Sequence, residues 1–284
     1  MLEPDSDQQH RKNLADTLKQ LRKAAGLSGE RLAARTAMSQ PKISRIESGK
    51  ALPSVTDVER ILKALDVGSE VREELLSLTR SANVEYTSLR SAARMGIWRS
   101  QAEIKALAES SSVVRQFLPA IPSGLIQTRD YARAVLTPGV EGRPARDIDR
   151  AVQARLESQD VLNDESRRFH FLLTEQAIRL KRATDSVMVG QLEHMAAVSD
   201  RPNVDLAILP NSELVKSSPL NVFVVYDDRL VLVEIFSGEV VLRDYRDISY
   251  HLNVFEHFRE RAVSGDNIRT LLASVADEFM RARD

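Results

Sequence analysis

The sequence predicts a mainly α protein with an α+β part: an N-terminal domain of five short helices, followed by a domain with a small antiparallel sheet. Three observations lead to this prediction. Apolar residues recur at helical spacing between residues 10 and 82, short β-rich runs begin only after residue 166, and 284 residues are more than one domain usually needs. We therefore expect domains at 1–82 and 115–284, joined by a helical connector at 83–114.

Composition limits the classes of protein to which this chain can belong. It has no cysteine, which excludes disulfides, thiolate metal sites and a cysteine nucleophile. The stretch "MLEPDSDQQHRKN" lacks the apolar core of a signal peptide, and no apolar run approaches the ~20 residues of a membrane span. We expect a soluble cytoplasmic protein, located at the nucleoid if it binds DNA.

The net charge of −1 hides a strongly basic segment. Between Gln9 and Leu52 there are ten lysines and arginines but only three acidic residues. A local positive field of this kind attracts a phosphate backbone. The alternative is a solvated helical surface that has no partner.

The first two helices are defined by apolar spacing and by the residues at their ends. Leu14, Leu18 and Leu21 recur at i, i+4 and i+7, and Gly26 ends this first helix. Ser28 then opens a second short helix.

The third helix lies within "SQPKISRIESGKALPS", residues 39–54, and has one apolar and one polar side. Ile43 and Ile46 share a face, whereas the polar side chains lie elsewhere around the helix. Pro41 suits an early helical position, and Gly49 marks the end. Two more helices, in "SVTDVERILKALDVG" and "SEVREELLSLTRSA", complete the domain.

The second and third helices, with the short turn between them, match the helix-turn-helix arrangement of DNA-binding proteins. The stretch "LRKAAGLSGERLAARTAMSQPKISRIESGKALPS" resembles the DNA-binding domain of the Cro/repressor-like XRE family, over about residues 11–70. This resemblance implies a sequence-specific transcriptional regulator that places its recognition helix, residues 39–48, in the major groove of double-stranded DNA.

The resemblance also implies which side chains contact the DNA. The side chains that face base edges or adjacent phosphates are those of Gln40, Lys42, Ser44 and Arg45. Those that touch the DNA backbone are Ser28 and Lys50, and Ser39 and Pro41 lie at the start of the recognition helix. A glutamine can pair with adenine and an arginine with guanine, while hydroxyls and lysines bind phosphate.

Two further features concern the support of the recognition helix. Arg22 and Glu47 match a pair that forms an internal ion pair in relatives, so we expect Glu47 to be structural. Gly29 replaces a glutamine that many relatives use for a polar contact to DNA. Ala37 replaces a glycine in the turn, where a left-handed alanine would cost about 1 kcal/mol.

The second domain is predicted from alternating helical and β-rich runs. Helices are expected in "IKALAESSSVVRQF", over 145–163, around "EQAIRLKR" and "SVMVGQLEHMAAVS", and at 247–262 and 265–282. Strands are expected in "RRFHFLLTE", "NVDLAILP", "NVFVVYDD", "LVLVEIF" and "EVVLRD".

Nothing in the sequence indicates an enzyme, a metal site or a cofactor. The five histidines lack the spacing of metal ligands, and there is no nucleophile elbow or glycine-rich phosphate loop. We therefore interpret the histidines and the acidic turn residues as structural.

The second domain also carries a resemblance. The segments "FLPAIPSGLIQTRDYARAVL", "FHFLLTEQAIRL", "VMVGQLEHM", "VDLAILP" and "VLVEIFSGEVVLRD" are similar to the C-terminal domain of WhiJ-like actinobacterial developmental regulators, over about residues 115–275. This implies an antitoxin-like module with a small protein partner, often encoded nearby.

Three hypotheses follow for the function. The first is a transcriptional regulator whose second domain receives a signal from a partner. The second is an antitoxin-like protein whose DNA binding only regulates its own expression, and the third is a one-component sensor of a small molecule. We also expect a homodimer, because closed two-fold dimers are the commonest oligomers and one recognition helix spans few base pairs.

Overall fold

The chain folds as two compact units, of which the smaller is helical. A computed structural model describes residues 4–88, 104–140 and 147–281. The first unit comprises Met1–Glu85 with Val241–Asp247, and the second comprises Tyr86–Val240 with Ile248–Asp284. No helix in the described ranges is both long and apolar enough to cross a membrane.

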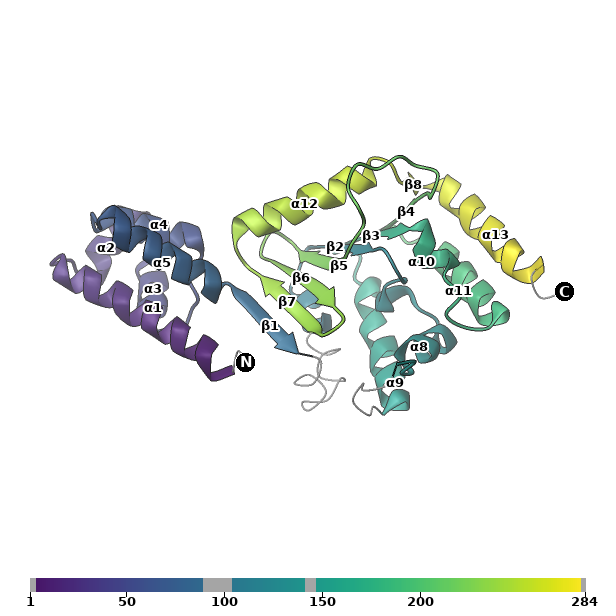
Figure 1. Ribbon diagram of the computed structural model, residues 1–284, viewed down its shortest axis with the longest axis horizontal. Coiled ribbons are helices and arrows are strands. Elements are labelled where there is room, and N and C mark those ends of the chain that lie inside the picture. Colours follow the sequence, from purple (N-terminus) through teal and green to yellow (C-terminus); the bar gives the residue numbers. More distant parts are fainter. Residues whose placement is uncertain (1–3, 89–103, 141–146, 282–284) are drawn as a thin grey trace. The chain divides into compact units, whose positions relative to one another are not determined.

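The five helices predicted for the first unit are all present (Figure 1). They are α1 (Pro4–Ala24), α2 (Gly29–Thr36), α3 (Gln40–Glu47), α4 (Val55–Ala64) and α5 (Ser69–Ala82). Their apolar faces meet in one core, to which each helix contributes. Its members are Leu14, Leu18, Leu32, Ala33, Ile43, Ile46, Val58, Ile61, Leu62 and Leu75. The i, i+3, i+4 spacing of these residues is what brings them to one side of each helix.

The second unit is built on a mixed sheet, which corrects the prediction of a small antiparallel one. Its strands are β1 (Val84–Ser88), β2 (Val113–Leu118), β3 (Arg168–Thr174), β4 (Val204–Leu209), β5 (Val222–Tyr226), β6 (Leu230–Ile235), β7 (Gly238–Leu242) and β8 (Val263–Ser264). Their order across the sheet is β1-β7-β6-β5-β2-β3-β4-β8. The centre is parallel, with β2 beside β3 and β3 beside β4, while β5, β6 and β8 pair antiparallel with their neighbours.

The parallel centre arises from the connections between the strands. The chain passes from β2 to β3 through η1 (Gly124–Ile126), α8 (Arg129–Leu136), α9 (Ile148–Ser158) and η2 (Gln159–Asn163). It passes from β3 to β4 through α10 (Glu175–Arg179) and α11 (Asp185–Val198). Crossovers of this length return the chain to the same edge of the sheet and give parallel strands. The β-rich runs were predicted correctly, but their pairing was not.

Strand β2 was missed because its sequence was interpreted as the end of a helix. The expected helix in "IKALAESSSVVRQF" covers only residues 104–109, and β2 follows at Val113–Leu118. Three serines interrupt the helical pattern, and the β-branched pair Val113-Val114 starts the strand. The connector predicted at 83–114 also contains β1, while residues 89–103 lie outside the described ranges.

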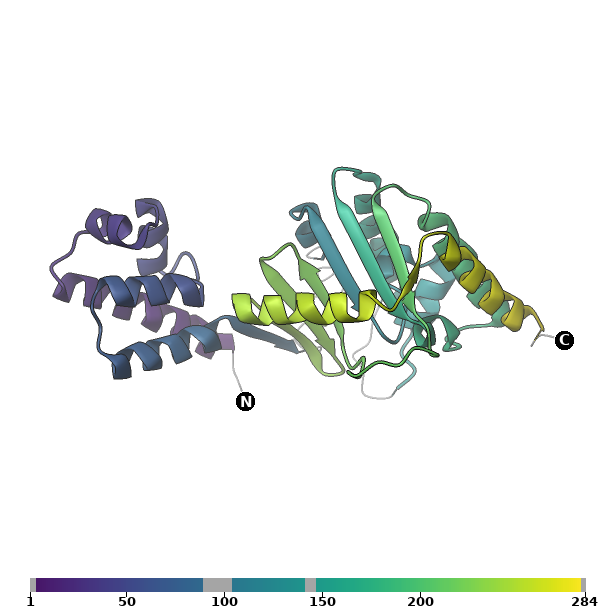
Figure 2. The ribbon, with the colours of Figure 1, turned by 90° about the horizontal axis from the view of Figure 1, so that it is seen from above.

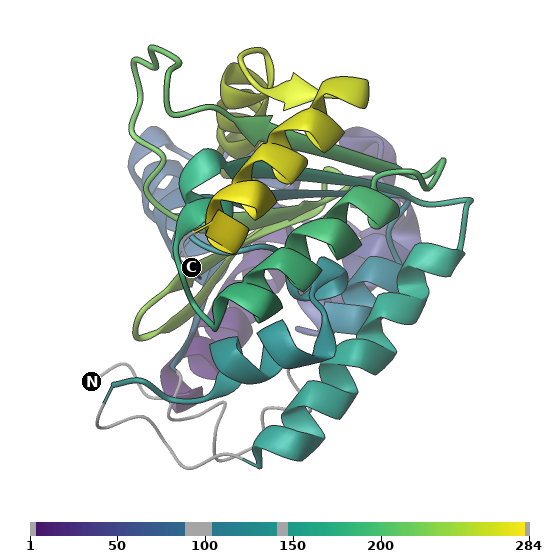
Figure 3. The same cartoon turned by 90° about the vertical axis from the view of Figure 1, so that its right-hand side faces the viewer.

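Helices cover both faces of the sheet. Helices α9, α11 and α13 (Asp266–Arg281) lie on one side (Figure 3). The main core forms there, where Phe169 and Phe171 of β3 pack with Leu192 of α11 and Leu272 of α13.

Helix α12 (Tyr245–Arg259) lies across the other face of the sheet (Figure 2). The ring of Phe258 from this helix stacks on Phe117 of β2, with 4.9 Å between the ring centroids. Phe117 also contacts Phe223, its partner across the β2–β5 pair. Because side chains alternate along a strand, Gln116 and Leu118 point to the face opposite Phe117.

Candidate nucleic-acid interface

The turn between α2 and α3 holds the two helices in a fixed relation. Ala37 adopts the left-handed conformation at φ 54°, as expected for the position that holds glycine in relatives. The amide of Met38 donates to the carbonyl of Ala33 over 3.0 Å, which closes the end of α2. Ser28 caps the start of α2 by accepting a hydrogen bond from the Arg31 amide.

Helix α3 has a buried side and an exposed side. Ile43 and Ile46 are each only 1% exposed and point into the core. All eight residues that the resemblance places at the DNA surface are exposed: Ser28, Ser39, Gln40, Pro41, Lys42, Ser44, Arg45 and Lys50. The hydrogen-bonding side of the helix therefore faces away from the protein.

Lys42 makes an ion pair that the sequence reasoning missed. Its Nζ atom lies 2.7 Å from Oδ1 of Asp57, at the start of α4. Asp57 is buried and also forms a capping box with Ser54, accepting from the Ser54 amide through Oδ2. The pattern Ser-x-x-Asp before an apolar run is the signal that could have identified this cap. The Lys42 ammonium is thus directed toward α4, although 47% of its side chain remains exposed.

Arg45 and Gln40 are the other long side chains of this surface. Arg45 Nε donates to the carbonyl of Pro41 over 3.3 Å, one turn earlier in the helix. Gln40 lies beside Gly29, where an added Cβ would be 3.9 Å from its Nε2 atom. A side chain at this position would therefore be in ordinary van der Waals contact with the Gln40 amide.

Arg22 and Glu47 form a two-pronged ion pair beneath the recognition helix. Arg22 Nε and Nη2 donate to the two Glu47 carboxylate oxygens over 2.6 and 2.8 Å, and Nη1 donates to the Leu27 carbonyl over 2.6 Å. The two side chains are only 13% and 10% exposed. The hydrogen bonds that Arg22 donates to Glu47 raise the pKa of the Arg22 guanidinium, so this group stays charged at neutral pH. This pair connects the end of α1, the loop before α2 and the last turn of α3.

Three titratable groups of the second unit, on β3, β4 and α12, contact one another. His170 of β3 lies 3.1 Å from Asp205 of β4, and Arg259 of α12 holds the same carboxylate through Nη2 at 3.0 Å. The hydrogen bond from His170, with Arg259 beside it, holds the pKa of Asp205 below its usual value. Among the described residues, no group of three or more His, Cys, Asp or Glu side chains is arranged to hold a metal ion.

Both parts of the chain match known protein families. Residues 101–274 match a family described as "Domain of unknown function (DUF5753)". The chain belongs to this family. In this DUF5753 protein, residues 13–75 also match a family described as "Helix-turn-helix domain". The second match confirms the helix-turn-helix interpretation of α2 and α3.

Three solved structures are distantly similar to this DUF5753 protein. NucT from Helicobacter pylori has a TM-score of 0.37 and 12% identity, over 64% of this chain and 98% of its own. TrmBL2, an archaeal chromatin protein, has a TM-score of 0.32 and 15% identity, over 73% and 66%. Nuc from Salmonella typhimurium, a phospholipase D family member, has a TM-score of 0.36 and 9% identity, over 64% and 95%. Scores this low carry no information about activity, and no curated protein matches the sequence.

We predict that Arg22 and Glu47 are energetically coupled. Removing either partner leaves the other charge sheltered and unpaired, so Arg22→Ala and Glu47→Ala should each destabilise the first unit, by about 3 kcal/mol. The double mutant should lose less than the sum of the two. Urea unfolding followed by amide signals of α1–α5 would measure all three changes, and strict additivity would contradict the coupling.

Proposed function

We propose that this protein is a sequence-specific DNA-binding transcriptional regulator of the XRE type. The observation that carries the proposal is the two-sided α3, whose polar face is exposed while Ile43, Ile46 and Glu47 anchor its other face. A helix anchored in this way can present side chains to base edges without losing its own packing. Catalysis forms no part of the proposal.

The proposed docking puts α3 in the major groove of a B-form duplex. Gln40, Ser44 and Arg45 then reach base edges or adjacent phosphates, and Ser28 with Lys50 contacts the backbone. The basic segment that precedes and contains α3 supplies the positive field for this approach. Helices α4 and α5 carry five acidic and four basic residues, so the field is confined to the α1–α3 part of the sequence.

Lys42 is given a different role from Arg45 in this docking. Its ammonium is already neutralised by Asp57, and it would have to exchange this partner for a phosphate to contact DNA. Arg45 has only a backbone carbonyl to release. We therefore assign base readout to Arg45 and a positioning role to Lys42.

The second unit is proposed to receive the signal that controls DNA binding. Its similarity to the C-terminal domain of WhiJ-like regulators supports a small protein partner as the source of this signal. Five apolar side chains in the described part of this unit are largely exposed: Val140, Leu214, Leu220, Phe236 and Tyr250. We take these side chains as candidate contacts for a partner chain.

We predict that Arg45→Ala relaxes sequence specificity more than Lys42→Ala does. Loss of a two-pronged base contact costs ~1–3 kcal/mol, whereas Lys42→Ala removes a group that Asp57 already neutralises. Affinities for a duplex selected from random sequence, and for single-base variants of it, would measure both effects. Arg60→Ala, at an exposed position of α4, is the control and should bind as the unchanged protein does. Wild-type affinity and selectivity in both α3 variants would show that the docking face is wrong.

We predict that the full chain is a homodimer held by the second unit. Two recognition helices related by a two-fold axis would bind half-sites about 34 Å apart or a multiple of this spacing. A single small module rarely reaches the roughly 10⁻⁸ M affinity of specific regulators. Light scattering of the full chain should give twice the monomer mass. A monomer at micromolar concentration, bound singly to a non-palindromic site, would contradict this prediction.

A further inference from the structure

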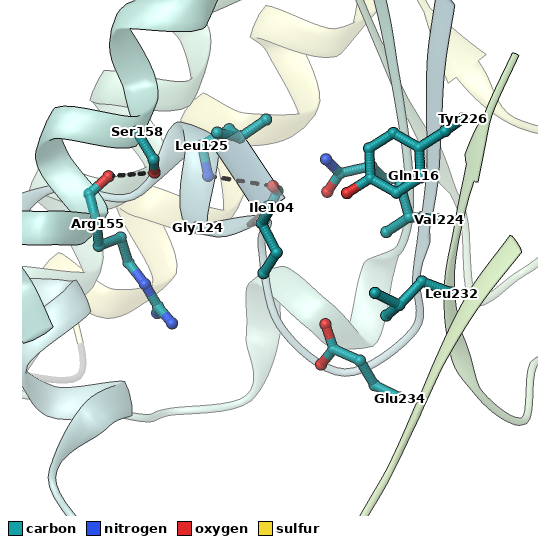
Figure 4. Close-up of a pocket in the computed structure, with 11 residues that line it drawn as sticks. Ile104, Gln116, Gly124, Leu125, Arg155, Ser158, Val224, Tyr226, Leu232 and Glu234 are labelled. Atoms are coloured by element: carbon teal, nitrogen blue, oxygen red, sulfur yellow. Dashed lines mark hydrogen bonds between the residues drawn. The ribbon is translucent and has the colours of Figure 1, made fainter. Parts of the chain in front are cut away.

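A small cavity lies in the second unit, between the sheet and the segment that follows β2. Its volume is about 90 Å³, and its walls come from β2, β5 and β6 on one side and from η1 and α9 on the other (Figure 4). This is well below the ~300 Å³ at which sites for drug-sized ligands begin. An occupant would therefore have only a few non-hydrogen atoms.

The sheet wall of the cavity is polar where an apolar core would be expected. Gln116, Val224 and Leu232 lie in line across β2, β5 and β6, because each is the register partner of the next. Tyr226 and Glu234 lie on the same face, on opposite sides of the Val224–Leu232 pair, because β5 and β6 are antiparallel. Elsewhere on this face the strands bury apolar side chains in the main core, including those of Val114 and Leu118.

Two of these polar groups are buried without a partner. Gln116 is only 5% exposed and Tyr226 only 1%, and neither side chain has a hydrogen-bond partner within the described part of the chain. In Figure 4 the Gln116 amide and the Tyr226 hydroxyl both point into the cavity. Burial raises the pKa of Tyr226, so its hydroxyl is a neutral group that can donate or accept. Buried polar groups in native proteins are almost always hydrogen-bonded, so we expect the hydrogen-bonding partner of these two groups to be a molecule in the cavity.

The two charged groups of the cavity come from opposite walls. Glu234 of β6 and Arg155 of α9 point toward one another in Figure 4. Glu234 is accessible to solvent at the cavity mouth but is surrounded by protein atoms, and this desolvation raises its carboxyl pKa while Arg155 acts to lower it. A positively charged group of a ligand beside the Glu234 carboxylate would stabilise its ionised form and offset the desolvation.

Arg155 is held in place from behind. Its Nη1 atom donates to Oε1 of Gln127 over 2.8 Å, and the Gln127 amide donates to the Pro122 carbonyl over 2.7 Å. The side chain passes Gly124 so closely that an added Cβ there would lie 3.2 Å from Arg155 Nε. Gln159 fixes the same segment by donating to the carbonyls of Gly124 and Gln127. Hydrogen bonds therefore fix the position of the Arg155 guanidinium in the cavity wall.

We propose that this cavity binds a small zwitterion of the size of the smallest amino acids. Its carboxylate is held by Arg155, its ammonium by Glu234, and its remaining hydrogen-bonding capacity by Gln116 and Tyr226. A molecule with charges of opposite sign at its two ends matches the two walls, because it places an ammonium beside Glu234 and a carboxylate beside Arg155. The inference concerns the second unit alone and does not depend on DNA binding.

Calorimetric titration of the full chain, without DNA, tests the proposal. Glycine, L-alanine and L-serine are the probes, and propionate and ethylamine are the two half-molecules of L-alanine. At least one amino acid should bind at millimolar concentration or below, and both half-molecules should bind at least about tenfold more weakly, because each lacks one charge-assisted contact. No binding by any of the three, or equally tight binding of propionate, would overturn the proposal.

Two conservative variants locate the site. Glu234→Gln keeps the shape of the side chain but removes its charge, and Tyr226→Phe removes only a hydroxyl. Each should weaken amino-acid binding about tenfold if its group contacts the ligand. Glu193→Gln, an exposed glutamate of α11, is the matched control and should bind like the unchanged chain. Undiminished binding in both cavity variants would place the ligand elsewhere and overturn the assignment.

Discussion

The ion pair between Arg22 and Glu47 is the interaction on which the DNA-binding surface depends. It ties the last turn of α3 to the end of α1 and, through the Leu27 carbonyl, to the loop that opens α2. The apolar contacts of Ile43 and Ile46 hold α3 against the core but do not set its direction, since apolar packing is less directional than a two-pronged charged hydrogen bond. The orientation of the exposed polar face therefore follows from two sheltered side chains that would not touch DNA.

The two units use buried polar groups in different ways. In the described part of the first unit the buried carboxylates each have a partner: Glu47 has Arg22, Asp57 has Lys42 and the cap of α4, and Asp244 has Arg246. In the second unit, glutamines fix the segment after β2 while Gln116 and Tyr226 are left open to a cavity. The first pattern suits a rigid surface, and the second suits a site that is completed by another molecule.

Local patterns predicted the elements well and their pairing poorly. The five helices of the first unit and the strands β3 to β7 could be located because spacing and turn residues are local signals. The parallel pairing of β2 with β3 could not, because it joins residues 55 positions apart and depends on the helices between them. In the candidate site, the resemblance suggested the Arg22–Glu47 contact, whereas the Lys42–Asp57 pair needed the three-dimensional position of α4. Gln116 was hidden for a similar reason, since its strand was interpreted as a helix.

The central claim is that the exposed polar face of α3 reads DNA. A crystal structure of the full chain with a duplex selected from random sequence tests it most directly. We expect α3 to lie in the major groove, with Arg45 and Gln40 within hydrogen-bonding distance of base edges and the Arg22–Glu47 pair intact. A complex in which the duplex contacts a different surface, with α3 facing solvent, would contradict it.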